Sequence, residues 1–134
     1  MSDRPTVLVA AGVIVREARV LLSQRKADSH LAGTWEFPGG KVEPDEDPRA
    51  ALKRELEEEL GVWAHVGDVL EVTFHRYAEK SVLLLFYEAS LLPDSPEPRP
   101  LDVAALTWAS SGDLARLELP PADVTIVEKV RRLL

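Results

Sequence analysis

The stretch from residue 39 to residue 62 constrains this chain more than any other, because it holds eight acidic side chains against four basic ones. A cluster of that density repels itself unless water solvates it or a cation binds to it. Two glycines, Gly39 and Gly40, open the stretch, and residues 39–47 are predicted to form a loop ahead of a helix.

The helix has clear start and stop signals. Asp47 is a favourable N-cap, Pro48 fits the first helical position, and Gly61 follows the last helical residue near Leu60. At the helical repeat, one face is apolar, the adjacent face carries three carboxylates, and Glu57 points to water. The apolar residues are Leu52, Leu56 and Leu60, and the three carboxylates are Glu55, Glu58 and Glu59.

Three carboxylates on one helix face disfavour folding at neutral pH unless something binds them. Oxygen ligands on a rigid element suit Mg²⁺ or Mn²⁺. The competing interpretation is a solvated acidic face, which is what most runs of charge are. The helix alone leaves the two interpretations open.

A longer spacing favours the metal site. Gly40, five residues, Glu46, seven residues and then residues 54–62 (RELEEELGV) fit G-x5-E-x7-R-E-U-x-E-E-x-G-U at every position, where U is apolar. This pattern resembles the Nudix box, the signature of the Nudix hydrolases. The segments QRKADSHLAGTWEFPGGKVEPDED and LPPAD also resemble the MutT branch and its relatives, the CTP pyrophosphohydrolases, so the resemblance covers nearly the whole chain.

Length and composition restrict which other classes of protein and site are possible. The 134 residues are predicted to form a single domain, and the lack of cysteine excludes disulfides and thiolate metal sites. The net charge of −7 argues against a nucleic-acid polymer as partner, although metal ions can join an acidic site to a polyphosphate. No signal peptide or membrane span is recognised, which predicts a cytoplasmic protein away from membranes. Monomer and homodimer both remain open.

Hydrophobic patterning predicts an α/β (α+β) fold with a mixed, mostly antiparallel sheet and a helix on each side. The resemblance implies the same architecture, an α/β/α sandwich with the sheet between two main helices. The expected strands span residues 6–15, 20–24, 35–38, 66–75, 81–91 and 104–109. The expected helices span residues 48–60, 111–117 and 121–134, the last burying either Val124, Val127, Val130 and Leu134 or Ile126 and Leu133.

The resemblance implies Mg²⁺-dependent hydrolysis of a nucleoside triphosphate, ribo or deoxy, to the monophosphate and pyrophosphate. It assigns metal binding to the Gly39 carbonyl and to Glu55, Glu58 and Glu59. It assigns to Glu46 a hydrogen bond with Arg54 that holds the loop against the helix. Asp102, aligned through Trp108, stands where many relatives have glutamate, and it is a further candidate ligand. Glu55 and Asp102 are the candidate general bases.

The resemblance also locates the substrate. Arg25 matches an arginine that contacts phosphate, and Asp123 is placed at the edge of the base. The remaining candidate substrate-binding residues are Phe37, Gly40, Lys41, Tyr77 and Val82, with Val7 and Val9 also near the base. Four of these residues have an ordinary alternative: a surface arginine at Arg25, a core ring at Phe37, a half-buried turn residue at Tyr77 and a helix N-cap at Asp123.

The prediction of which base the protein binds depends on Asp123. MutT has an asparagine at the matching place, whereas an ionised aspartate only accepts hydrogen bonds. Acceptance suits the exocyclic amine of cytosine, which favours (d)CTP or 5-methyl-(d)CTP. A protonated Asp123 would donate to an oxidised guanine, so an 8-oxo-dGTP diphosphatase that cleans the nucleotide pool is the alternative. Other hypotheses are a dinucleoside polyphosphate or nucleoside diphosphate sugar hydrolase, a non-catalytic nucleotide-binding regulator, and a structural protein with an acidic helix.

Overall fold

The computed structural model describes residues 4–134, which contain seven strands and four helices. The prediction that the N-terminal segment is not a signal peptide falls partly on Met1–Asp3, which lie outside the described residues. The strands are β1 (Thr6–Arg16), β2 (Arg19–Gln24), β3 (Trp35–Glu36), β4 (Gly39–Lys41), β5 (Ala64–Arg76), β6 (Ser81–Leu91) and β7 (Ala105–Ala109). The helices are α1 (Pro48–Leu60), α2 (Ser111–Arg116), α3 (Pro121–Val124) and α4 (Val127–Arg131).

The sheet is mixed, as predicted. Its main order is β3-β2-β1-β6-β5, while β4 pairs with β1 and β7 pairs with β2. β1 runs parallel to β6, with Thr6 opposite Ser81 and Ile14 opposite Ala89. The remaining pairings of the described strands are antiparallel, and they include the two expected hairpins, β1–β2 and β5–β6.

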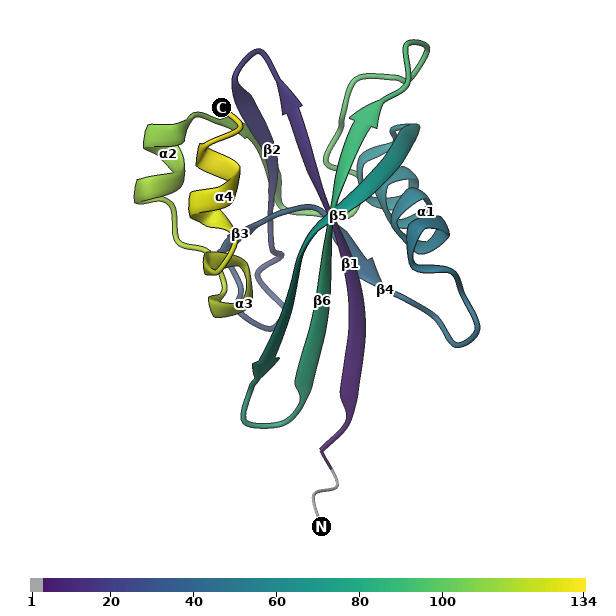
Figure 1. Cartoon of the computed structure of the whole chain (residues 1–134), viewed down its shortest axis with the longest axis vertical. Helices are drawn as coiled ribbons and strands as arrows, with labels where there is room; N and C mark the ends of the chain where they lie inside the picture. Colours follow the sequence, from purple (N-terminus) through teal and green to yellow (C-terminus); the bar gives the residue numbers. More distant parts are fainter. Residues whose placement is uncertain (1–3) are drawn as a thin grey trace.

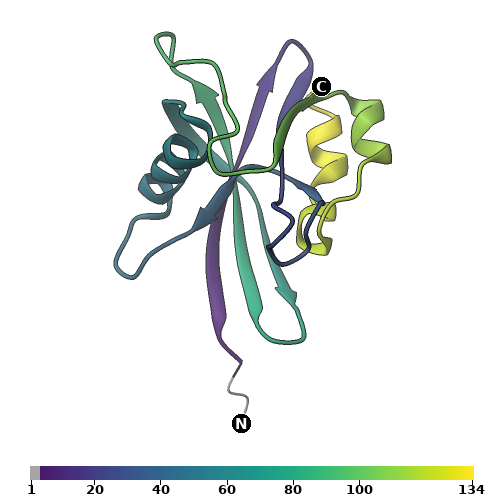
Figure 2. The same ribbon diagram turned by 180° about the vertical axis from the view of Figure 1, so that it is seen from behind.

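Helices cover both faces of the sheet, which confirms the α/β/α sandwich. Figures 1 and 2 show α1 on one side of the strands and α2, α3 and α4 together on the other. The apolar side chains form two clusters accordingly. On the α1 side the fully buried residues are Ala10, Leu21, Leu52, Leu56, Leu60 and Val62. On the other side they are Val20, Leu22, Phe86, Ala109, Ile126 and Val130.

Helix α1 begins and ends at the predicted residues. The Asp47 side chain accepts a hydrogen bond from the Arg49 N–H at 3.4 Å, and Pro48 occupies the first turn. Gly61 ends the helix with a φ of 68°, and its N–H donates to the Glu57 carbonyl. The three buried leucines hold one face of α1 against the sheet, so the carboxylates of the adjacent face lie beside β4.

Residues 39–41 form strand β4, so the prediction of a loop is wrong at this point. Gly39 pairs with Ala11 and Gly40 with Ala10 of β1. A Cβ on Gly39 would overlap the Ala10 carbonyl oxygen, so only glycine allows the two backbones to approach this closely. Glycine has low strand propensity, and the strand therefore depends on tertiary contact.

The C-terminal segment forms two short helices instead of the predicted continuous one. Thr125, at the end of α3, hydrogen-bonds through its hydroxyl to the Ala122 carbonyl and to the Thr73 hydroxyl of β5. Such local side-chain bonds compete with the regular helix ladder. Val124 is 55% exposed, whereas Ile126 is fully buried. The expectation that Val124 lies on the buried side is wrong.

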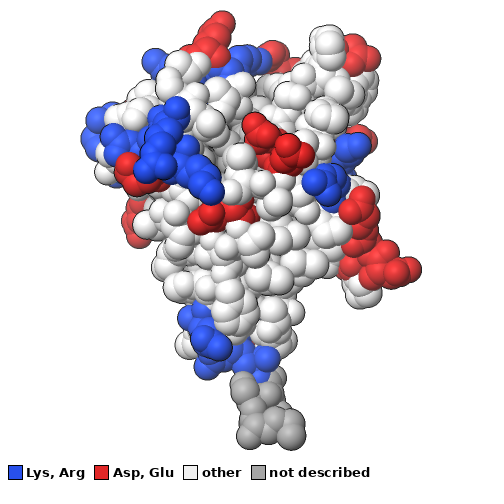
Figure 3. Space-filling model, viewed as in Figure 1, with Lys and Arg blue, Asp and Glu red and all other residues white. Residues whose placement is uncertain are grey.

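Charged side chains are unevenly distributed over the face seen in Figure 3. Basic side chains gather over α2 and α4, and acidic ones gather along the edge formed by the loop before α1. The basic residues of the two helices and the residue after α4 are Arg116, Lys129, Arg131 and Arg132. None of the helices in residues 4–134 has the length and apolarity needed to cross a membrane.

Candidate active site

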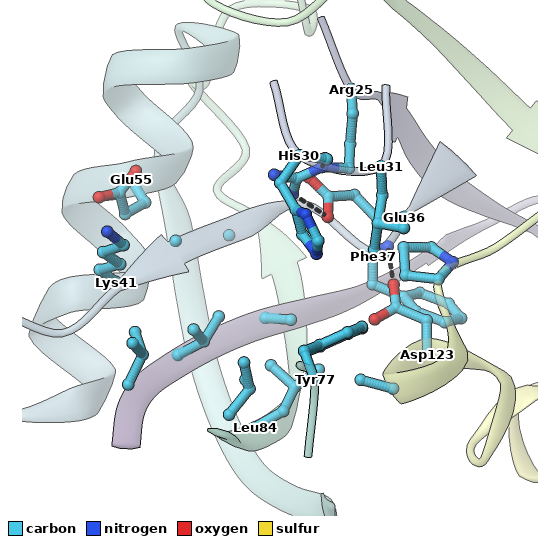
Figure 4. Close-up of a pocket in the computed structure, with 18 of the residues that line it drawn as sticks. Arg25, His30, Leu31, Glu36, Phe37, Lys41, Glu55, Tyr77, Leu84 and Asp123 are labelled. Carbon is cyan, nitrogen blue, oxygen red and sulfur yellow. Dashed lines mark hydrogen bonds and ion pairs between the residues drawn. The ribbon is translucent and has the colours of Figure 1, made fainter. Parts of the chain in front are cut away.

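A cleft of about 380 Å³ opens over β1 and β6, between α1 and β4 at one end and α3 at the other (Figure 4). It brings together residues that are far apart in the sequence. The predicted site residues that line it are Arg25, Phe37, Gly39, Gly40, Lys41, Glu55, Glu59, Tyr77, Val82 and Asp123, together with Val7 and Val9. Glu46, Arg54, Glu58 and Asp102 lie outside its lining.

Carboxylates crowd the α1 end of the cleft. Glu55 extends over Gly40, where a Cβ would overlap the Glu55 carboxylate. Burial raises the pKa of Glu59 well above its ordinary value, and the nearby charges of Glu55 and Glu36 raise it further. A cation between these groups would remove the repulsion that raises this pKa. The oxygen-only donor set, with the Glu55 carboxylate placed over Gly40, therefore fits a hard divalent metal ion.

Arg54 joins the loop before α1 to these carboxylates. Its guanidinium donates two hydrogen bonds to Glu46, which confirms the predicted contact, and it also donates to the Lys41 carbonyl at 3.1 Å. It donates to Glu55 at 2.9 Å and to Glu58 at 3.3 Å. The hydrogen bonds from Arg54 lower the pKa of Glu46, so this carboxylate stays ionised.

Two of the predicted metal ligands, Glu58 and Asp102, lie outside the lining of the cleft. The Glu58 side chain is 58% exposed and its carboxylate contacts Arg54. Asp102 forms an ion pair with Lys26, while its N–H donates to the Glu59 carbonyl at 3.1 Å. Within residues 4–134 no three histidine, aspartate or glutamate side chains are arranged to hold a metal ion. The complete ligand set therefore stays a prediction.

The opposite end of the cleft contains a buried aspartate. Asp123 is 5% exposed, and its Oδ2 accepts a hydrogen bond from the Phe37 N–H at 3.2 Å. Burial raises the pKa of Asp123 to about 8, and the charge of Glu36 adds to the effect. Asp123 lies in the first turn of α3, but its side chain is held by Phe37 in the cleft, so the simple N-cap interpretation is wrong.

Aromatic rings surround this end of the cleft. The Phe37 ring is 2% exposed and meets Phe86 edge-on at 5.8 Å, as expected for a core ring, although Phe37 also lines the cleft. Tyr77 is half-buried in the β5–β6 turn and contacts His30 at 5.2 Å and His75 at 4.5 Å between ring centroids. The walls here are thus flat and partly apolar, which suits a planar ring.

Arg25 is held by two acceptors in the middle of the cleft. Its Nη1 donates to Glu36 Oε2 at 2.9 Å and its Nε donates to the His30 carbonyl at 2.6 Å. Burial raises the pKa of Glu36, and Arg25 opposes that rise. Sequence reasoning missed Glu36, His30 and Lys80 as cleft residues. The available signal was an acidic residue inside a short strand, between Trp35 and Phe37.

The NUDIX domain model matches residues 6–130 of this chain. The chain belongs to the NUDIX family. The predicted family is thereby confirmed, and the protein is a NUDIX hydrolase. NUDIX hydrolases generally need a divalent metal ion, usually Mg²⁺, which agrees with the carboxylates at the α1 end of the cleft.

Several relatives of this NUDIX hydrolase are named for nucleotide hydrolysis. It is 43% identical to the CTP pyrophosphohydrolase of Escherichia coli K12 over 90% of this chain and 87% of that protein. It is 31% identical to the 8-oxo-dGTP diphosphatase of the same strain over 93% and 96%. Its structure matches that of a MutT NUDIX hydrolase from Burkholderia pseudomallei with a TM-score of 0.84 at 32% identity, over 95% and 99% of the two chains.

Proposed function

We propose that this NUDIX hydrolase cleaves a nucleoside triphosphate, ribo or deoxy, into the nucleoside monophosphate and pyrophosphate. The observation that carries the proposal is the arrangement of a single cleft, with the Glu55 and Glu59 carboxylates at one end and the aromatic walls around Asp123 at the other. A nucleotide has the same division between a charged phosphate chain and a planar base. The CTP pyrophosphohydrolase relative supports this reaction.

Glu55, Glu58, Glu59 and the Gly39 carbonyl are the groups that would hold Mg²⁺, with Mn²⁺ as a substitute. When bound, the metal supplies charge neutralisation and acidifies water. Glu55 takes the proton from the attacking water in this proposal, with Asp102 as the second candidate. Arg54 and Glu46 hold the Glu55 carboxylate in place, and Arg25 contacts phosphate.

Cytidine nucleotides, (d)CTP or 5-methyl-(d)CTP, are the substrates that we favour. Oδ2 of Asp123 is occupied by the Phe37 N–H, which leaves Oδ1 for the base. An ionised Oδ1 accepts a hydrogen bond from the exocyclic amine of cytosine. The binding partner in this proposal is a free nucleotide. The net charge of −7 favours a free nucleotide over a nucleic-acid polymer.

Hydrolysis of 8-oxo-dGTP is the second candidate, and the burial of Asp123 favours it. With a pKa of about 8, this carboxyl is largely protonated at neutral pH in the free protein. A protonated Oδ1 donates a hydrogen bond, which suits the oxo groups of an oxidised guanine. The 8-oxo-dGTP diphosphatase relative supports this alternative.

The test is pyrophosphate release in the presence of Mg²⁺, with kcat/KM compared for dCTP, 5-methyl-dCTP, dGTP and 8-oxo-dGTP. A preference for the two cytidine nucleotides is the expected result. A large preference for 8-oxo-dGTP would instead assign the protein to nucleotide-pool sanitation. If none of the four is hydrolysed, the proposal fails and dinucleoside polyphosphates and nucleoside diphosphate sugars become the next substrates to assay.

A further inference from the structure

Strand β5 forms an open edge of the sheet. Among residues 4–134 only β6 pairs with it, and no described strand pairs with its other side. Proteins usually protect such an edge with charged side chains, proline or a covering segment, because its free backbone groups pair readily with another strand. The middle of β5 instead exposes two large apolar side chains, with Val72 55% exposed and Phe74 48% exposed. This edge is thus suited to a partner strand.

The backbone groups that point outward are those of Val72, Phe74 and Arg76. Across the β5–β6 turn, the Tyr77 N–H donates to the Lys80 carbonyl at 2.8 Å, so Tyr77 faces β6. In an antiparallel pair, successive residues turn their N–H and carbonyl groups alternately toward the neighbouring strand and away from it. The register of β5 with β6 is regular over this segment, so every second residue before Tyr77 faces β6 and the residues between face outward.

The open segment has a defined end and two defined faces. It ends at Leu70, whose carbonyl accepts a hydrogen bond from Lys129 Nζ of α4 at 2.8 Å. Thr73 is buried, and its hydroxyl is hydrogen-bonded to the threonine that ends α3. Side chains alternate between the faces of a strand, so Val72 and Phe74 lie together on the face opposite α3. A partner strand would meet both of them at once.

Charge is divided along β5. Asp68 and Glu71 lie before the two exposed apolar residues, and His75 and Arg76 lie at the end of the strand. Figure 3 shows an uncharged area on the face that β5 crosses in Figure 1, with acidic side chains on one side of it and basic ones on the other. A second β5 that runs antiparallel brings the acidic end of each strand to the basic end of the other, whereas a parallel neighbour would oppose like charges. The edge is therefore complementary to itself, as a two-fold interface requires.

We propose that two copies of this chain associate by antiparallel pairing of their β5 strands, about a two-fold axis that passes beside Thr73. In this register Val72 of one copy lies opposite Phe74 of the second copy, and the reverse pair lies on the other side of the axis. The outward N–H and carbonyl groups of both residues then form hydrogen bonds between the copies. An aromatic ring beside a β-branched side chain is a favourable cross-strand pair. The β5 edge is thus assigned as a dimer interface.

The same register pairs the charged ends of the strands. Glu71 lies opposite His75 of the second copy, where the carboxylate accepts from the imidazole N–H. Between Val66 and Glu71 the register of β5 shifts twice against β6, so this part of the strand is shortened. The shortening brings Asp68 close to Arg76 of the second copy. Two such contacts form, one at each end of the interface.

Sedimentation equilibrium of the full chain tests the association, with samples from about 1 µM to about 1 mM. The paired edge is short, so we expect a weak dimer with a dissociation constant on the order of 10 to 100 µM. The apparent mass should rise from that of one chain to that of two chains over this range. It should rise no further, because a two-fold contact is closed.

Val72→Pro tests the backbone pairing. It removes an N–H that points outward, so the monomer loses no hydrogen bond, and proline is tolerated on an edge strand. The dissociation constant should rise more than about tenfold. Phe74→Lys carries the same test if the proline variant does not fold, because it places a charge at the centre of the interface. Leu133→Lys is the matched control, since Leu133 is 46% exposed and follows α4. It should keep the wild-type dissociation constant.

A mixing experiment identifies the partner as a second copy in the antiparallel direction. Asp68→Arg alone opposes two basic side chains at each end of the interface, and Arg76→Asp alone opposes two acidic ones, so each variant should be monomeric. An equimolar mixture of the two variants restores both contacts between opposite charges and should form a mixed dimer. Its dissociation constant should return to within about threefold of the wild-type value.

Three results would overturn the inference. A wild type that keeps the mass of one chain up to about 1 mM has no such interface. A dimer that persists in both Val72→Pro and Phe74→Lys, with the folded state confirmed by thermal unfolding, is held by another surface. A mixture that stays monomeric while the wild type dimerises rules out the antiparallel register. All of these measurements report mass, so they are independent of the proposed hydrolysis.

Discussion

Arg54 and Glu46 share two hydrogen bonds, from Nε to Oε2 at 2.9 Å and from Nη2 to Oε1 at 3.0 Å. Through its third nitrogen Arg54 also donates to Glu55. The pair therefore connects the loop before α1 to a carboxylate that lines the cleft. A bidentate pair of this kind fixes direction as well as distance.

Replacing Glu46 by Gln should lower kcat/KM by roughly tenfold to a hundredfold, as is typical when a group that orients a metal ligand is changed. The change removes one charge and one of the two paired acceptors, so Arg54 no longer holds Glu55 in one orientation. Steady-state kinetics with Mg²⁺ measure the effect, and circular dichroism checks the fold. Wild-type turnover in this variant would show that the Arg54 network has no catalytic role.

Glu58→Gln should reduce metal-dependent hydrolysis by about a hundredfold or more while the fold survives. Within residues 4–134 the Glu58 carboxylate accepts one hydrogen bond, from Arg54 Nη1 at 3.3 Å, and it is 58% exposed, so it is available to turn toward a metal ion. Titration with Mg²⁺ should show a raised midpoint. The control is the adjacent, exposed Glu57→Gln. Equal activity in the two variants would remove Glu58 from the ligand set.

The choice of base should depend on pH through Asp123. Below its pKa of about 8 the carboxyl is protonated and donates, and above it the carboxylate only accepts. The ratio of kcat/KM for dCTP to that for 8-oxo-dGTP should therefore rise as the pH is raised from about 6.5 to about 9.5. Asp123→Asn, which does not titrate, should flatten the profile. A ratio that keeps its pH dependence in this variant would place the titrating group elsewhere.

Stability without metal should fall as the pH rises. Asp123 and Glu59 have pKa values above their ordinary ones, so the folded protein retains protons that the unfolded chain releases, and raising the pH through this window favours unfolding. Melting temperatures from about pH 5 to about pH 9 should decrease steadily. Mg²⁺ should reduce the part of the decrease that comes from Glu59, and Asp123→Asn should reduce the part that comes from Asp123. A melting temperature that rises over this range would contradict both shifts.

Helix α1 and its contacts with the preceding loop were predictable because their causes are local. Asp47, Pro48 and Gly61 define the ends of the helix by their own backbone preferences, and the leucine spacing decides which side is buried. The resemblance then supplied the pairing of Glu46 with Arg54, which the structure contains. Sequence information of this kind predicts which residues are in contact within one helical turn or one motif.

Features that depend on the meeting of distant segments were not predictable in the same way. Strand β4 exists because Gly39 allows close approach to β1, while Gly40 leaves space for the Glu55 carboxylate, and no propensity indicates this arrangement. Glu36 enters the cleft because β3 pairs with β2 and brings it to Arg25. The raised pKa of Asp123 follows from its burial and from the charge of Glu36, against the hydrogen bond from Phe37, whereas a sequence read residue by residue suggests an ordinary ionised aspartate.

The parallel pairing of β1 with β6 has a consequence for how the protein is made. β1 pairs early with β2 and β4, which follow it closely in the chain, but its parallel partner β6 begins only at Ser81. Until β6 is made, the edge of β1 that β6 will cover presents open backbone groups, a feature that promotes association between nascent chains. Pairing over such a long separation also slows folding. A chain that ends before Ser81 would thus be an aggregation-prone fragment. Once the β5–β6 hairpin is complete, β6 can pair with β1 and cover its open edge.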